Sequence, residues 1–270
     1  EAYATEIGMV LEEIGYQLRH IRGWAKPKRV KTPLMHFPST SYIYNEPYGS
    51  VLIMSPWNYP FQLAMVPLVG AIAAGKCVVV KPSEYSFHTS EIIEKILKEV
   101  FDEEYVAVVR GGREANKLLL DEKFDYIFFT GSIEVGKLVM RAAAQHLTPV
   151  SLELGGKSPC IIEKTANIDI AAKRISFGKY LNAGQTCVAP DYILADNTVI
   201  NNFIERITYW LKTFFPTGAL NDNNYPKIIN EKHFSRLINL LNQGKITIGG
   251  NYDQNSLKIE PTIITDISFD

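Results

Sequence analysis

The stretch that decides the fold reads Cys77-Val78-Val79-Val80-Lys81-Pro82-Ser83-Glu84. Its first four residues form a continuous apolar run, which predicts a buried strand, and polar residues follow at once. Two similar runs come later, at residues 106–109 and 125–129, and helical patterns separate the three. Short apolar strands separated by helices indicate a parallel sheet with both faces covered. The predicted fold class is therefore α/β, a doubly wound parallel sheet in which ligands lie at the carboxyl ends of the strands.

The pattern of strands and helices extends over most of the chain. We expect helices at residues 3–22, 64–74, 90–100, 114–120, 133–144, 168–180 and 203–214, and further strands at residues 41–45, 50–54, 150–154, 160–162 and 192–195. The pattern restarts after Gly155-Gly156, so we place a domain boundary there. Residues 1–154 are predicted to form a Rossmann-like, dinucleotide-binding domain with an N-terminal helix. Residues 155–270 are predicted to form a second α/β domain.

Composition excludes several classes of protein. The 270 residues are 46% hydrophobic, which supports a large core, and the net charge is −1. The longest basic run, residues 26–31, is short and interrupted, so a nucleic acid partner is not expected. No run approaches the roughly 18 apolar residues of a transmembrane segment, so none is expected.

The cysteines indicate the redox setting. Cys77, Cys160 and Cys187 are odd in number and widely separated, which argues against a disulfide framework and against a CxxC metal site. We therefore expect no metal and a cytoplasmic location. Cys77 and Cys160 lie in or beside apolar strands and are expected to be buried small hydrophobic residues.

Cys187 has a different setting, because glycine, small polar residues and a closing proline surround it in Asn182-Ala183-Gly184-Gln185-Thr186-Cys187-Val188-Ala189-Pro190. An exposed loop would give its thiolate access to a carbonyl carbon. Cys187 is thus the candidate covalent nucleophile. The alternative is an inert, buried thiol, the commoner fate of a lone cysteine.

Glu153 interrupts an otherwise apolar strand just before Gly155-Gly156. A carboxylate there is costly unless it has a partner or a task, and burial would raise its pKa into the range of a general base. We expect Glu153 to be such a base. A salt bridge at the strand end is the alternative.

Two turns follow predicted strands and are candidates for binding a dinucleotide. Residues 129–136, which include Gly131, Ser132 and Gly136, form a strand-to-helix turn whose backbone N–H groups could hold a pyrophosphate. Lys81 and Glu84 follow another strand and could bind ribose hydroxyls. A tight turn capped by Ser132 and a solvated turn at Glu84 are the alternatives without a ligand.

The segment Pro56-Trp57-Asn58-Tyr59-Pro60 brackets one amide side chain between two aromatic residues and two prolines. Asn58 could donate its NH₂ group to a developing oxyanion, a device that contributes roughly 3 kcal/mol of transition-state stabilisation. The alternative is that the segment only packs. None of the histidines has metal-ligand spacing.

Together these motifs resemble the aldehyde dehydrogenase superfamily. The segments PWNYP, KPSE, FTGSIEVG, LELGGKSP and GQTC occur in the family's order and spacing, over residues 42–262. Details such as LTPV at residues 147–150 and GQTCVAPDY at residues 184–192 are most similar to the class 3 branch, which acts on fatty and aromatic aldehydes.

The resemblance implies a role for each residue. Cys187 would attack the aldehyde to give a thiohemiacetal, with Asn58 and the Cys187 N–H as the oxyanion hole, and Glu153 would activate water to hydrolyse the thioester. NAD or NADP would be the cofactor. The residues implied to bind it are Trp57, Lys81, Glu84, Gly131, Ser132 and Gly136.

The resemblance also implies that residues 155–270 form an incomplete α/β catalytic domain and that the sequence is incomplete. It begins at Glu1 without methionine, and it lacks the Glu-x-Phe-Gly-Pro segment and the C-terminal portion that complete the family's substrate pocket and homodimer. Two alternatives stay open: a CoA-acylating relative, in which CoA resolves the thioester, and a truncated inactive paralogue that binds only nucleotide or a partner subunit.

Overall fold

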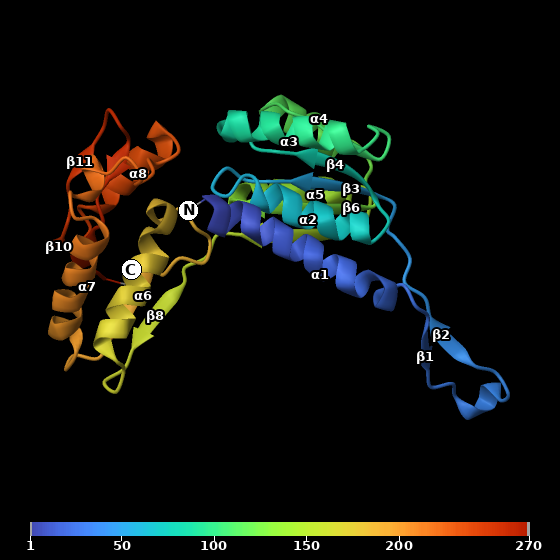
Figure 1. Ribbon diagram of the computed structural model, residues 1–270, viewed down its shortest axis with the longest axis horizontal. Helices are drawn as coiled ribbons and strands as arrows, with labels where there is room; N and C mark the ends of the chain where they lie inside the picture. Colours follow the sequence, from blue (N-terminus) through green and yellow to red (C-terminus); the bar gives the residue numbers. More distant parts are fainter. Residues whose placement is uncertain (1, 269–270) are drawn as a thin grey trace. The chain divides into compact units, whose positions relative to one another are not determined.

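The computed structural model describes residues 2–268, and the chain divides into two compact units, Glu1–Leu154 and Gly155–Asp270 (Figure 1). Residues 1, 269 and 270 lie outside the described part. No described helix is long and apolar enough to cross a membrane.

The first unit is built on a five-stranded sheet in which every neighbouring pair is parallel. Its strands are β3 (Ser50–Met54), β4 (Cys77–Lys81), β5 (Val106–Val108), β6 (Tyr126–Gly131) and β7 (Val150–Leu154). They lie in the order β5-β4-β3-β6-β7. The first strand of this sheet in sequence, β3, is central. The strands β4 and β5 extend the sheet on one side of it, and β6 and β7 extend it on the other side, so the doubly wound fold class is confirmed.

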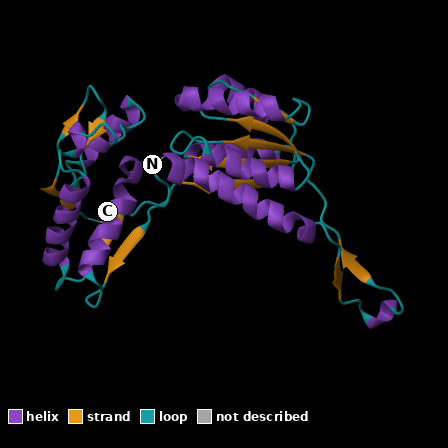
Figure 2. Ribbon diagram, in the orientation of Figure 1, coloured by secondary structure: helices purple, strands orange, loops and turns teal. Residues whose placement is uncertain are grey.

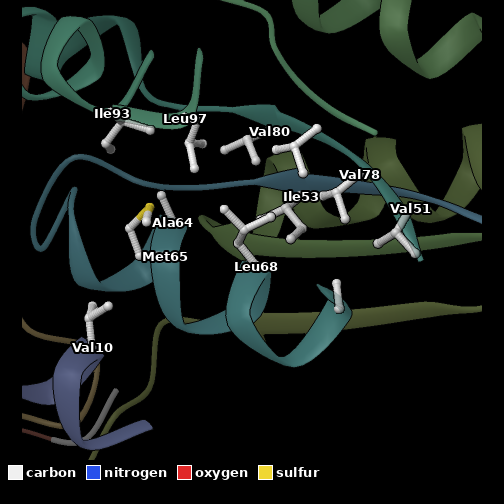
Figure 3. Packing of buried hydrophobic residues seen from close by; sticks show 12 residues of the cluster. Val10, Val51, Ile53, Ala64, Met65, Leu68, Val78, Val80, Ile93 and Leu97 are labelled. Carbon is white, nitrogen blue, oxygen red and sulfur yellow. The ribbon is translucent and has the colours of Figure 1, made fainter. Parts of the chain in front are cut away.

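Helices cover both faces of this sheet (Figure 2). They are α2 (Gln62–Ala73), α3 (Phe87–Val100), α4 (Arg113–Asp121) and α5 (Ile133–Ala144), and α1 (Gly8–Trp24) packs on α2. On one face, Leu68 of α2 and Ile93 of α3 pack against Ile53 and Val80 (Figure 3). On the other face, Val139 of α5 packs with Leu52 and Phe129. Successive strand residues therefore point to opposite cores, which explains the continuous apolar runs.

One predicted strand does not join this sheet. The segment expected at residues 41–45 forms β2 (Ser41–Ile43), which pairs antiparallel with β1 (Lys28–Val30) in a separate ribbon. The turn between them carries the 3₁₀ helix η2 (Leu34–His36). The sequence showed only a short basic run at β1, because this strand has no apolar face.

The second unit is also α/β. In it, β8 (Pro159–Ile162) and β9 (Tyr192–Ala195) are parallel, and α6 (Ile168–Tyr180) packs on α7 (Ile200–Phe214) around a small apolar core. The remaining elements are η4 (Leu181–Gly184), η5 (Ala219–Asn221), α8 (Glu231–Leu240), β10 (Lys245–Ile248), β11 (Tyr252–Asp253), β12 (Lys258–Ile259) and β13 (Ile263–Thr265). The carboxylate of Asp169 joins the two large helices by accepting hydrogen bonds from Arg206 and Trp210.

The sequence did not predict α8 or β10 to β12. Phe234 is the buried residue of α8, and the strands are two to four residues long. Elements this short contain too few apolar positions to establish a period, so propensity alone does not reveal them.

Candidate functional site

The parallel register of the first unit brings most of the predicted site residues to one edge of the sheet. Met54 lies opposite both Lys81 and Phe129, and Thr130 lies opposite Glu153. Lys81 and Glu153 lie at the ends of β4 and β7, and the segments that follow the strands carry Asn58, Glu84 and Ser132. They all lie at the carboxyl ends of the strands, where a doubly wound sheet binds its ligand.

The segment that carries Asn58 is tied to its neighbours through backbone atoms. Before it, the Ser55 N–H donates to the Lys81 carbonyl oxygen at 3.1 Å. Within it, the Ser86 hydroxyl donates to the Trp57 carbonyl oxygen at 3.2 Å, and after it the Leu63 N–H donates to the Tyr59 carbonyl oxygen at 3.0 Å. These contacts connect the Asn58 segment to the turn after β4 and to the first turn of α2.

Lys81 is the most unusual group at this edge, because its side chain is charged and the residue is only 4% exposed. Its Nζ donates to the Pro82 carbonyl oxygen at 2.9 Å. Desolvation lowers the pKa of Lys81, and the negative charge of Glu84 opposes this shift. A buried ammonium has three donors, so this position is suited to hydroxyl groups of a bound ligand.

Glu84 is exposed and begins the 3₁₀ turn η3 (Glu84–Ser86). Its carboxylate lies against Gly112, where an added Cβ would be 2.2 Å from Oε2. Gly112 is thus a site residue that the sequence analysis missed. The signal for it was the Gly111-Gly112 pair at the end of a predicted strand.

The turn after β6 is compact, as its two glycines suggested. A Cβ on Gly131 would lie 2.5 Å from the ring of Phe129, and one on Gly136 would lie 2.8 Å from a methyl group of Leu154. The Ser132 hydroxyl caps α5 by accepting from the Val135 N–H at 3.3 Å. The first turn of α5 therefore packs closely against the carboxyl edge of the sheet, with its exposed N–H groups there.

Two expectations about burial are wrong. Glu153 is exposed, since β7 is an edge strand with a neighbour on only one side. Cys77 is also exposed, because it opens β4 at the amino edge, where its side chain lies outside the cores. Cys160 is half-buried, and desolvation raises the pKa of its thiol.

Cys187 lies in the second unit and is exposed. The backbone before it makes a tight left-handed turn, with φ of 51° at Asn182, 52° at Ala183 and 77° at Gly184. Asn and Gly adopt this conformation readily, whereas Ala183 does so at a cost of about 1 kcal/mol. Other contacts must hold this loop in place.

Gln185 supplies those contacts, and sequence reasoning gave it no role. Its Nε2 donates to the Asn182 and Lys227 carbonyl oxygens, at 3.2 and 3.1 Å, and its Oε1 accepts from the Ile229 N–H at 3.0 Å. The side chain thereby joins the turn before Cys187 to a segment 44 residues later. Nothing in the local pattern could reveal that partner.

Charged groups lie just after the cysteine loop. Asp191 pairs with Lys157 at 3.0 Å, and Lys179 Nζ is 3.9 Å from its other oxygen. Burial lowers the pKa of Lys179, and Asp191 opposes this shift. A Cβ on Gly156 would lie 3.5 Å from the Cys187 carbonyl oxygen, so the Gly155-Gly156 segment passes close to the loop. Among residues 2–268, no cluster of histidine, cysteine and acidic side chains could hold a metal ion.

The fold and these residues define an α/β protein of the nucleotide-binding type joined to a unit with an exposed cysteine. The family model described as "Aldehyde dehydrogenase family" matches residues 1–270. The chain belongs to the aldehyde dehydrogenase family.

Its relatives include 4,4'-diaponeurosporen-aldehyde dehydrogenase of Staphylococcus aureus, which is 47% identical over 100% of this chain. The mouse "aldehyde dehydrogenase, dimeric NADP-preferring" and the Macaca fascicularis "aldehyde dehydrogenase family 3 member A2" are each 46% identical over 98% of it. The expected likeness to the class 3 branch is confirmed by these relatives. The chain spans 59%, 59% and 55% of their respective lengths.

Solved structures agree with the fold. A substrate-bound Staphylococcus aureus AldH superposes with a TM-score of 0.95 at 47% identity, and the match covers 100% of this chain and 59% of that one. An NAD-dependent aldehyde dehydrogenase from Sinorhizobium meliloti has a TM-score of 0.87 at 28% identity, over 98% of this chain and 54% of its own. The names of these relatives mention both NAD and NADP, so the expectation of NAD or NADP as cofactor fits the family.

Proposed function

We propose that the full-length protein oxidises an apolar aliphatic or aromatic aldehyde to the carboxylic acid, with NAD or NADP as hydride acceptor and Cys187 as covalent nucleophile. The observation that carries this proposal is the exposed Cys187 on a braced turn, in a chain that matches the aldehyde dehydrogenase model along its whole length. A thiol that is accessible and held in place suits attack on a carbonyl carbon.

In the first step, the Cys187 thiolate forms a C–S bond with the aldehyde carbon, and the carbonyl oxygen becomes an oxyanion. The Asn58 amide and the Cys187 N–H donate hydrogen bonds to this oxyanion. The resulting thiohemiacetal loses its hydride and becomes a thioester. Covalent attachment divides a difficult oxidation into easier steps and keeps the carbon in place throughout.

In the second step, Glu153 accepts a proton from a water molecule as that water attacks the thioester carbon. The Cys187 thiolate leaves, and the carboxylic acid is released. Glu153 does not have the burial that the sequence suggested, but its carboxylate on an edge strand is accessible to the water that it would activate.

The edge of the first unit fits a dinucleotide. The buried ammonium of Lys81 and the carboxylate of Glu84 would hold ribose hydroxyls, and Gly131, Ser132 and Gly136 would surround the pyrophosphate at the start of α5. Trp57 would contact the cofactor from the neighbouring segment. When bound, the nicotinamide ring supplies the hydride acceptor.

The class 3 likeness supports a proposal about the substrate class. Fatty and aromatic aldehydes are apolar, and small molecules of this kind are the partners we propose. We also propose a homodimer, because the turn between β1 and β2 exposes Leu34, Met35 and Phe37 almost fully. A cytoplasmic location stays a prediction.

The test uses full-length protein with NAD or NADP and aliphatic aldehydes of increasing chain length, and it follows absorbance of the reduced nicotinamide. The Cys187→Ser variant should lose turnover by about a thousandfold or more, and it should also lose esterase activity. Cys77→Ser, which removes another exposed thiol, is the control and should stay active. Absence of turnover with either cofactor at every chain length would exclude the proposed reaction.

Product analysis with and without CoA separates hydrolysis from acyl transfer. Free carboxylic acid in both conditions supports the role given to Glu153. An acyl-CoA product that forms only when CoA is present would instead identify a CoA-acylating enzyme.

A further inference from the structure

The segment before α1 reaches the start of α2 through Glu6. This residue lies in the π-helical turn η1 (Tyr3–Ile7), which leads directly into α1. Its carboxylate accepts hydrogen bonds from the Phe61 N–H at 2.7 Å and from the Gln62 N–H at 3.3 Å. The two partners are 55 and 56 residues away in sequence. Glu6 therefore binds the first residues of α2, a helix that is far from it in sequence.

Helix α2 is not capped by its own N-cap residue. Its N-cap residue is Phe61, which offers no side-chain acceptor, and its first turn holds no acidic residue. The N–H groups at the start of a helix need acceptors, and a negative charge there also interacts favourably with the helix dipole. The carboxylate of Glu6 meets both needs from a different helix.

The capped helix begins where the Asn58 segment ends. That segment is fixed before Asn58 by the bond from the Ser55 N–H to Lys81, and it is fixed at Trp57 by Ser86. After Asn58, the chain enters α2 at Phe61, where Glu6 binds. The Asn58 amide thus lies between two fixed ends, and Glu6 is the attachment on the far side.

Packing supports this attachment. Val10, one turn after Glu6, is 4% exposed and belongs to the same core as Ala64 and Met65 of α2 (Figure 3). Single π-helical turns occur often at functional positions in proteins. With Val10 buried against α2, the carboxylate of Glu6 is held at the first turn of that helix.

We propose that Glu6 is a positioning residue for Asn58: by capping α2 from outside, it holds the oxyanion-binding amide in its productive place. This inference rests on the proposed function, because it assigns Glu6 a part in the role given to Asn58. A displacement of about 1 Å at such a donor lowers the rate of the chemical step.

The experiment compares Glu6→Ala, Glu6→Gln and the control Glu12→Ala in the full-length protein. Glu12 is an exposed glutamate of α1, so its removal changes the same charge on the same helix without touching the cap. Amide hydrogen exchange of a peptide spanning residues 56–65 reads the cap directly, without substrate or cofactor. In Glu6→Ala this exchange should rise by about 5- to 30-fold, the range expected for loss of a helix cap.

The activity measurements divide the effect between kcat and KM. Glu6→Ala should lower kcat by about 3- to 10-fold. The KM for NAD or NADP should change by less than this factor, because Ser86 still holds the Trp57 carbonyl oxygen. Glu6→Gln retains one acceptor oxygen and should recover much of that loss, and Glu12→Ala should match the wild type. In an Asn58→Ala background, Glu6→Ala should lower kcat by less than about 2-fold, because the group it positions is gone.

Two results overturn the proposal: unchanged exchange in the Glu6→Ala variant, or an equal loss of kcat in the presence and absence of the Asn58 amide. If Glu6→Ala does not fold, Glu6→Gln is compared with Glu12→Ala instead. Exchange and kcat in Glu6→Gln that equal those in Glu12→Ala would then overturn the proposal. Inactive wild-type protein would contradict the proposed function instead, and the exchange data would still report whether Glu6 holds the Asn58 segment.

Discussion

At the scale of single residues, Lys81 carries the most physical information. An ammonium group that is almost completely buried raises the free energy of the folded state unless a partner or ligand offsets its lost hydration. Here the carbonyl oxygen of Pro82 and the charge of Glu84 offset only part of it, since the pKa of Lys81 remains lowered. A buried charge with a lowered pKa at the ligand edge of a sheet is typical of a binding residue.

The Lys81→Met variant should bind NAD or NADP about 10- to 100-fold more weakly, because a charged donor is lost, yet it should be at least as stable as the wild type near neutral pH. The direction in which stability changes with pH follows from the lowered pKa of Lys81. Because the folded-state pKa lies below 10.5, the unfolded chain binds more protons in the window between the two values. Wild-type stability therefore rises relative to the variant as pH approaches 10.5.

Urea unfolding of both proteins at neutral and alkaline pH checks this prediction, together with cofactor titration. Lys95→Met, at an exposed position of α3, is the control and should change neither quantity. A variant that is less stable by the same amount at every pH would contradict the assignment.

At the scale of elements, contacts from distant segments hold the cysteine turn and the start of α2 in their conformations. The residues Asn182 to Gly184 indicate a turn, but the turn is held by Gln185, whose partners come from a distant loop. The first turn of α2 is likewise capped from another element. In contrast, α5 carries its own cap at Ser132, and the sequence predicted that helix to begin at its observed first residue.

Gln185→Leu preserves the size of the side chain but removes the hydrogen bonds to Asn182, Lys227 and Ile229, leaving the Ile229 N–H without this acceptor. Unfolding free energy should fall by about 1–2 kcal/mol, and kcat should fall roughly 10-fold because the cysteine turn loosens. Gln243→Leu, at an exposed position of the same unit, should affect neither. Chemical denaturation and steady-state kinetics provide the measurements, and full activity of Gln185→Leu would show that the turn holds itself.

At the scale of the whole molecule, the proposed functional groups are divided between two units. Asn58, Glu153 and the residues proposed to bind the dinucleotide belong to the first unit, and Cys187 belongs to the second. The two units coincide with the residue ranges that we assigned to a cofactor domain and a catalytic domain, and those two roles stay predictions. The β1–β2 ribbon is a third feature at this scale, since its turn exposes apolar residues that a monomer would leave in water.

If this turn lies in a subunit interface, Leu34→Asp combined with Phe37→Asp should convert the full-length protein from a dimer to a monomer. Burial of two charges in an apolar contact is costly, so association should weaken by several orders of magnitude. Sedimentation velocity measures the change. Leu118→Asp, on the exposed face of α4, should remain dimeric, and a double variant that is still a dimer would place the interface elsewhere.

The sequence by itself determined the strand and helix succession of the first unit, the break at Gly155 and the family of the protein. These features depend on local patterns: apolar runs, helical periods, and motifs whose residues lie next to one another. It also identified most candidate site residues by their chemical type. It did not predict β1, α8, the exposure of Cys77 and Glu153, or the roles of Gly112 and Gln185.

Only the tertiary structure decided those points, because each depends on residues far apart in the chain. Glu153 is exposed because β7 has one neighbour, a fact of strand order that no local pattern contains. Gln185 braces the cysteine turn across 44 residues, and Glu6 caps α2 across 55. Burial and polar contacts depend on which distant residues the fold brings together. Periodicity in the sequence indicates only which side of a helix or strand is apolar.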